Sequence, residues 1–317
     1  MLRRRTWRRA ALVLVVLLVG AAVWRVEVSV KDIEQTWPPT GAFLNVEGQR
    51  VHYVRAGEGP PVVLIHGASG NLRDWTFRIF DEMAAAHDVI AFDRPGHGYS
   101  DRAAEDGSNP HVQARILRQA LATLGIERAI LVGHSYGGSV ALAWAVDAPE
   151  GVAGLLLLGA PSHPWEGGAG TFYDLAANRV TGPLLSNLIA WMAGDRAVDR
   201  TLTRIFAPDP VPEGYGAHVG TGLALRPETI RANARDITAL KAHLRAAVAH
   251  YPDLTMPIEL LHGTADIIVP MRVHSLPFGQ KVPHANVVAL EGAGHMLQHS
   301  RPDAVLAALG RLAAAID

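Results

Sequence analysis

A serine between two glycines is the residue of this sequence best placed to do chemistry. Ser135 lies at the centre of residues 133–137 (Gly-His-Ser-Tyr-Gly), directly after an apolar run and before a stretch with helical spacing. A strand that turns sharply into a helix needs small residues two positions before and two positions after the serine, because the backbones approach closely there. The pattern therefore predicts a nucleophilic serine whose hydroxyl is presented at the turn.

A base and an acid are needed beside such a serine, because a serine hydroxyl is a weak nucleophile until a base takes its proton. We expect His295 to be the base, since it follows the apolar run at residues 286–290. Asp266 follows the apolar run at residues 258–261. A carboxylate there would hold the tautomer of His295 and stabilise its protonated form. Glu166 is the alternative acid.

Acyl transfer also needs N–H donors for the negative oxygen that develops on the substrate, and the loss of one donor costs roughly 3 to 4 kcal/mol. We expect one donor to be the backbone N–H of Tyr136, the residue after the nucleophile. The second is expected from Ala68, which lies in a glycine-containing loop after the apolar run at residues 62–65. Ser69 and Asn71 could add side-chain donors, although a hydrogen-bonded turn is the expected role of both.

The composition excludes several other kinds of site. The chain has no cysteine, which excludes a disulfide framework, a thiolate zinc site, an iron–sulfur cluster and a cysteine nucleophile. His295 and His299 have the spacing of a zinc-binding pair, but Met296 stands where a zinc protease carries glutamate. No nucleotide-binding glycine pattern occurs, and the net charge of -1 argues against nucleic-acid binding. We therefore expect no metal and no organic cofactor.

The elements that must position these residues form an alternating series. A hairpin pattern covers residues 42–55, a capped helix begins at residue 110, and a closing helix covers residues 302–315. Short β-branched runs alternate with segments of helical spacing at residues 62–65, 89–92, 129–132, 152–158, 258–261 and 286–290. Alternation of this kind predicts an α/β fold with a mostly parallel, doubly wound sheet. The runs are almost continuously apolar, as strands buried on both faces require.

The alternation is interrupted at residues 162–250, which contain helical stretches and no convincing strand. We interpret this block as an inserted helical cap on a core formed by residues 41–161 and 251–317, with a linker at residues 31–40. Trp75, after the oxyanion loop, and Trp191, on an apolar cap helix, are candidate substrate-binding residues. Helix packing is the alternative role for both.

In order and spacing, these motifs resemble those of the α/β-hydrolase family over residues 41–316. The resemblance rests on His66 and Gly67, on residues 93–100 (Asp-Arg-Pro-Gly-His-Gly-Tyr-Ser), and on Ser135, Asp266 and His295. It implies the α/β-hydrolase fold, a structural role near the site for residues 93–100, and a lid formed by the insertion. Members that open epoxides or displace halide carry aspartate at the position of Ser135, and members that hydrolyse carbon–carbon bonds often carry asparagine at the position of His134.

The expected function is hydrolysis of a carboxylic ester of a small to medium apolar substrate through an acyl intermediate on Ser135. Two alternatives use the same three residues: hydrolysis of a carbon–carbon bond, and acyl or peroxy transfer to a nucleophile other than water. A non-catalytic binding protein is a third alternative, and the presence of Ser135, Asp266 and His295 together argues against it.

The first 30 residues predict a membrane anchor or a signal segment. Five arginines precede an uncharged run of 15 residues at positions 10–24, which Arg25 ends. Such a run is short for a bilayer span, which needs about 20 residues, but Trp7 and Trp24 could extend it to the interfaces. We expect a single transmembrane helix that attaches an exported catalytic domain to a membrane. A cleaved signal, giving a secreted or periplasmic enzyme, and a buried helix are the alternatives.

Overall fold

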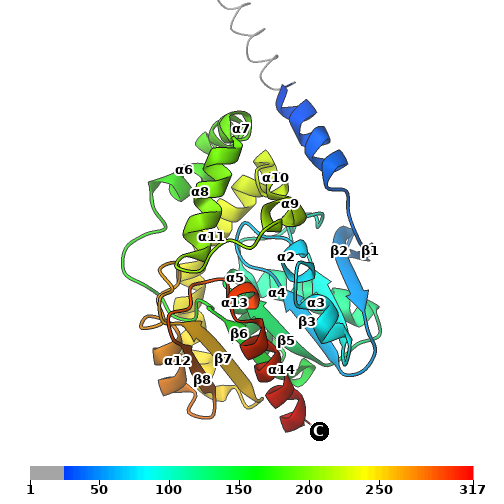
Figure 1. The fold of residues 1–317 in the computed structure, drawn as a ribbon, viewed down its shortest axis with the longest axis vertical. Coiled ribbons are helices and arrows are strands. Elements are labelled where there is room, and N and C mark those ends of the chain that lie inside the picture. The colour runs from blue at the N-terminus through cyan, green and yellow to red at the C-terminus, as the bar shows by residue number, and fades with distance from the viewer. Residues whose placement is uncertain (1–24, 317) are drawn as a thin grey trace, which may run out of the picture.

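One eight-stranded sheet forms the centre of the molecule in the computed structural model, which describes residues 25–316 (Figure 1). The strand order is β1-β2-β4-β3-β5-β6-β7-β8. The strands are β1 (Ala42–Val46), β2 (Gln49–Ala56), β3 (Pro61–Ile65), β4 (Asp88–Phe92), β5 (Ala129–His134), β6 (Val152–Leu158), β7 (Ile258–Gly263) and β8 (Asn286–Leu290). β2 pairs antiparallel with β1 and β4, and all other pairs are parallel. The predicted mostly parallel sheet is confirmed.

The strands are apolar throughout because both faces of the sheet are covered. In β3, Val63 and Ile65 pack into the core cluster on one face, whereas Val62 and Leu64 pack into the cluster on the other face. Successive side chains of a strand point to opposite faces, so an uninterrupted apolar run is what a central strand needs.

Helices cover the two faces separately. One face carries α2 (Arg73–Thr76), α3 (Phe80–Ala84), α13 (Leu297–Ser300) and α14 (Pro302–Ile316). The other face carries α4 (Pro110–Thr123), α5 (Tyr136–Asp147) and α12 (Ser275–Lys281), with the short 3-10 turns Pro149–Gly151 and Val248–Asp253. The start of α4 agrees with the prediction: Pro110 is its first residue, and the side chain of Asn109 caps it by accepting a hydrogen bond from the N–H of His111 at 3.0 Å.

The segment between β6 and β7 is helical and lies beyond the carboxyl ends of the strands (Figure 1). It comprises α6 (Thr171–Ala177), α7 (Thr181–Met192), α8 (Asp195–Phe206), α9 (Tyr215–Val219), α10 (Thr221–Ala224) and α11 (Pro227–Ala247). The last two turns of α11 bury Leu240, Leu244 and Ala247 in the same core cluster as α5. The inserted helices are therefore held to the sheet through α11.

The described N-terminal residues correct the membrane prediction. The apolar run at residues 10–24 lies outside the described residues. Residues 25–36 form a helix that carries Glu27, Lys31, Asp32 and Glu34, and such a charge density is costly in hydrocarbon. Between residues 25 and 316, no helix is both long and apolar enough to cross a bilayer. The predictions of a transmembrane segment and of a membrane-attached location are therefore corrected for the described residues, which do not test the predicted apolar helix at residues 10–24.

The same N-terminal helix packs on the inserted helices. The indole N–H of Trp37 donates to the carbonyl of Ala217 in α9 at 2.7 Å, and Glu34 pairs with Arg226 at 2.8 Å. The indole also lies so close to Gly220 and Gly222 that a side chain at either glycine would meet it within 3 Å. Residues 31–36, expected to belong to a linker, are helical and lie against α9 and α10.

Candidate active site

Ser135 occupies a strained turn between β5 and α5. Its backbone has φ 51° and ψ -125°, a region that residues with a side chain rarely adopt. The flanking glycines are required by close contacts. A Cβ on Gly133 would lie 2.5 Å from the Cα of Gly138, and a Cβ on Gly137 would lie 2.1 Å from the carbonyl oxygen of Ile65. The sequence folds into this turn because only glycine fits at both positions.

Asp266 and His295 form a buried hydrogen-bonded pair. Asp266 follows β7 and His295 follows β8, and these neighbouring parallel strands end at the same edge of the sheet. The Nδ1 of His295 lies 2.7 Å from the Oδ2 of Asp266. Burial alone would raise the pKa of Asp266, but hydrogen bonds with His262 and His295 outweigh it and hold that pKa well below its usual value. Asp266 is therefore ionised at neutral pH, when it can orient His295.

The turn at Ser135 and the Asp266–His295 pair meet at the end of β6. The N–H of Ser135 donates to the carbonyl of Leu158 at 2.9 Å. A Cβ on the next residue, Gly159, would lie 3.2 Å from the Nδ1 of His295 and 3.3 Å from the Oδ2 of Asp266. The three predicted residues thus gather at one edge of the sheet. Within residues 25–316, the Ser135 hydroxyl makes no direct hydrogen bond with His295. Such bonds are often long before substrate binds.

The segments that carry the two expected oxyanion donors both adjoin Ser135. A Cβ on Gly67 would lie 3.1 Å from the Cβ of Ser135, so the loop that contains Ala68 passes directly beside the nucleophile. Asn233 of α11 fixes that loop by accepting a hydrogen bond from the N–H of Ser69 at 2.7 Å. Tyr136 is the first residue of α5, where a backbone N–H has no partner inside the helix.

Residues 60–302 match the family model described as the alpha/beta hydrolase fold. The chain belongs to the α/β-hydrolase family. A 2-hydroxymuconate semialdehyde hydrolase of Pseudomonas putida is 31% identical to this hydrolase, over 83% of this chain and 90% of the relative. The resemblance inferred from the motifs is confirmed.

Solved structures agree with the family assignment. An esterase from Rhodococcus sp. ECU1013 superposes with a TM-score of 0.64 at 25% identity, over 86% of this chain and 97% of that one. An enol-lactonase from Burkholderia xenovorans LB400 superposes with a TM-score of 0.70 at 20% identity, over 86% of this chain and 100% of that one. The first supports a hydrolase, and the second supports the fold.

The two candidate substrate-binding tryptophans of the hydrolase lie in opposite environments. Trp75 belongs to α2 and is fully buried in the core cluster on that face of the sheet, so its position is that of a packing residue. Trp191 is 57% exposed on α7, where Leu184 is also largely exposed. The apolar surface of α7 therefore faces solvent. Glu166, the alternative acid, is exposed in the loop after β6.

A second buried acid–histidine pair lies near the site, and the sequence contained no signal for it. The Oδ1 of Asp74 accepts hydrogen bonds from the hydroxyl of Tyr215 at 2.7 Å and from the Nε2 of His299 at 2.8 Å. Gln298 donates to the Oδ2 of Asp74 at 2.9 Å. Burial raises the pKa of Asp74, but His299 more than offsets this and lowers it well below its usual value. The pair joins α2 and α13 of the core to α9 of the insertion.

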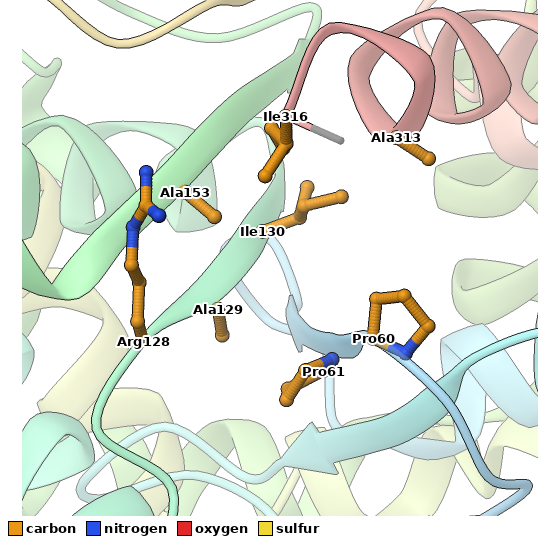
Figure 2. Close-up of a pocket in the computed structure, with 8 residues that line it drawn as sticks. All are labelled: Pro60, Pro61, Arg128, Ala129, Ile130, Ala153, Ala313 and Ile316. Atoms are coloured by element: carbon orange, nitrogen blue, oxygen red, sulfur yellow. The ribbon is translucent and has the colours of Figure 1, made fainter.

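One cavity of the described structure lies away from Ser135. This cavity of about 190 Å³ is lined by residues such as Pro61, Ala129 and Ala153, which lie at the amino ends of their strands. Figure 2 shows these side chains. Sites in open α/β sheets form at the carboxyl ends, so this cavity is not the candidate active site.

In the described part of the chain, no three His, Asp or Glu side chains are grouped to hold a metal ion.

Proposed function

We propose that this hydrolase cleaves carboxylic esters through an acyl intermediate on Ser135. The observation that carries the proposal is the buried Asp266–His295 hydrogen bond of 2.7 Å beside a serine held at positive φ. A nucleophile, a base and an orienting carboxylate in this relation are the parts that acyl transfer needs.

In the proposed reaction each group has its own step. The Nδ1 of His295 faces Asp266, so its Nε2 is the atom that takes the proton of the Ser135 hydroxyl as the oxygen attacks the ester carbonyl. The N–H groups of Ala68 and Tyr136 stabilise the negative oxygen of the tetrahedral intermediate. His295 then returns the proton to the leaving alcohol. Water, activated by His295, attacks the acyl group and releases the acid.

Small to medium apolar esters are the proposed substrates. Only 8% of Ser135 and 3% of His295 is exposed, so the reacting groups are enclosed by protein. Enclosure of this kind favours substrates whose acyl group can be buried, since each buried methylene contributes about 0.8 kcal/mol.

Hydrolysis of a carbon–carbon bond is the second candidate. The relative from Pseudomonas putida is named as a 2-hydroxymuconate semialdehyde hydrolase, and the match extends over 90% of its length. This similarity favours the second candidate. The same serine, histidine and aspartate would serve both reactions.

A paired substrate assay tests the two candidates. The full chain is supplied with aryl esters of acyl chains from two to twelve carbons and, separately, with 2-hydroxymuconate semialdehyde. Ester cleavage with an acyl adduct on Ser135, found by mass spectrometry of the quenched enzyme, supports the proposal. Turnover of the semialdehyde alone would replace ester hydrolysis by the second candidate. The Ser135→Ala variant, which lacks the nucleophile, controls for background in both assays, and added alcohol or peroxide reveals transfer.

A further inference from the structure

A buried arginine is bonded to the peptide unit that carries one oxyanion donor. Arg94 follows β4 and is fully buried. Its Nε donates to the carbonyl of His66 at 3.0 Å, and its Nη2 donates to the carbonyl of Gly67 at 3.1 Å. The Gly67 carbonyl and the Ala68 N–H belong to one planar trans peptide and point in opposite directions. Fixing the carbonyl toward Arg94 therefore fixes the Ala68 N–H away from it.

The imidazole of His66 gives the same carbonyl a second donor. The backbone N–H of Arg94 donates to the Nε2 of His66 at 2.9 Å, so this nitrogen carries no proton. The proton of the neutral ring is then on Nδ1, which donates to the carbonyl of Gly67 at 2.9 Å. Burial, followed by the charge of Arg94, lowers the pKa of His66 to about 4 and keeps this tautomer at neutral pH.

Arg94 also touches the segment that carries the other donor. Its guanidinium lies over the ring of Tyr136, 4.4 Å from the ring centroid, and Tyr136 supplies the second N–H of the site. The Nη1 of Arg94 is held by Gln113 of α4 at 2.8 Å and by Asp236 of α11 at 3.0 Å. Asp236 pairs with Arg102 as well, at 2.7 Å. One fixed cation thus contacts both oxyanion segments.

We propose that Arg94 is a positioning residue that orients and polarises the Gly67–Ala68 peptide, so that the Ala68 N–H becomes a stronger and fixed donor to the substrate oxygen. Hydrogen bonds in series polarise one another, by about 10–30% per bond in condensed phases. The planar fork of arginine can hold the two successive carbonyls of His66 and Gly67, which a lysine ammonium cannot match in geometry. The role in turnover rests on the proposed function, whereas the effect on the peptide exists without substrate.

A magnetic resonance measurement tests the effect on the peptide directly. Protein labelled with ¹³C at glycine carbonyls and ¹⁵N at alanine shows only the amides of its seven Gly-Ala pairs. The Ala68 resonance is assigned by its loss in Ala68→Ser. In Arg94→Met we expect the Ala68 amide proton to shift upfield relative to the other pairs. In Gln113→Leu, which removes a contact of Arg94 but no bond to Gly67, we expect it to stay in place.

The kinetic arm uses enzyme whose active sites are counted with a fluorophosphonate, so that unfolded protein does not affect kcat. Arg94→Met should lower kcat for an aryl ester about ten- to a hundredfold with little change in KM, less than the roughly 100- to 1,000-fold loss of a whole oxyanion donor. Arg94→Lys should fall between Arg94→Met and the parent, because it keeps the charge but only part of the geometry. Gln113→Leu should stay near the parent.

An unshifted Ala68 resonance in folded Arg94→Met would overturn the proposal, as would an unchanged kcat per labelled site. If Arg94→Met does not fold, Arg94→Lys replaces it, because lysine keeps a positive charge beside Asp236 but cannot hold the carbonyls of His66 and Gly67 with one planar fork. The Ala68 resonance should again move upfield, and its failure to move would be equally decisive. A parent enzyme that cleaves no ester would refute the proposed function while the resonance shift still decides the role of Arg94.

Discussion

The imidazole rings of His134 and His295 lie with their centroids 4.8 Å apart, and the Nε2 of His134 donates to the main-chain carbonyl of His295 at 3.1 Å. The residue before the nucleophile thus supports the residue that we expect to take its proton. Burial, followed by the proximity of His295, lowers the pKa of His134 to about 3. Because the ring of His134 is neutral, His295 is the only one of these two imidazoles that becomes positively charged beside Ser135 during turnover.

Because His66 and His134 are neutral in the folded protein, the free energy of unfolding depends on pH. His66 and His134 bind protons in the folded protein only near pH 4 and pH 3, whereas in the unfolded chain they bind them near pH 6.5. As pH falls below about 6.5, the unfolded state takes up protons that the folded state does not, so the folded state loses roughly 1.4 kcal/mol per histidine per pH unit until about pH 4. Urea unfolding at pH 7 and pH 5 measures the loss. It should be smaller in His134→Asn, and equal stability at both pH values would contradict the assignment.

Replacements of Ser135 should separate chemistry from backbone strain. Both Ser135→Ala and Ser135→Gly should remove turnover, since neither has a nucleophilic oxygen. Because φ is 51° at this position, Ser135→Gly should be more stable than Ser135→Ala, by about 1 kcal/mol. Thermal unfolding of both variants, with circular dichroism as a check of the fold, gives the comparison. A glycine variant less stable than the alanine variant would show that the turn is unstrained.

Asp266→Asn tests the orienting carboxylate. An amide at this position could present an N–H to the Nδ1 of His295, which would favour the wrong tautomer, and kcat should fall by up to about 10⁴, by analogy with serine proteases. Glu166→Gln is the matched control, because Glu166 is exposed in the loop after β6 and should leave kcat unchanged. The kcat of both variants and of the parent is measured with an aryl ester. A loss in Glu166→Gln with full activity in Asp266→Asn would move the acid to Glu166.

Two glycine-to-alanine changes should have opposite effects on stability. In Gly137→Ala the new Cβ would lie 2.1 Å from the carbonyl oxygen of Ile65, and neither backbone can yield without moving β3 or α5. We expect a loss of about 3 kcal/mol or more. In Gly310→Ala, within α14, the new Cβ meets nothing within 4 Å, and the helix should gain about 0.5–1 kcal/mol. Urea unfolding of the two variants and the parent measures both changes.

The strands and the turn at Ser135 could be predicted because their signals are local. The apolar run at residues 152–158 gives the bounds of β6, and the residues that follow two other runs proved to be the bonded pair Asp266 and His295. Periodicity along the chain reports which face is buried. The carboxyl ends of neighbouring parallel strands lie together, which brings the residues that follow them into one site.

The remaining features depend on contacts between distant segments, which periodicity does not report. Arg94 stood in a loop motif, but its bond to Asp236 in α11 joins residues 142 positions apart. Asn233, which fixes the loop of Ala68, looks like any polar residue of a long helix. Trp75 follows a polar loop, yet the core encloses it completely. Only the packed position of the insertion distinguishes such residues from surface ones.

The hydrogen bond from Trp37 to Ala217 joins segments 180 residues apart in the chain. The carbonyl of Trp37 in turn accepts from the hydroxyl of Tyr99, and the carbonyl of Pro38 accepts from Arg73. Tension on the chain at residue 25 would therefore be borne first by α9, α10, α2 and the loop after β4, before it reached the edge strand β1. We therefore expect pulling at that end to break these contacts before it separates β1 from the sheet that carries Ser135.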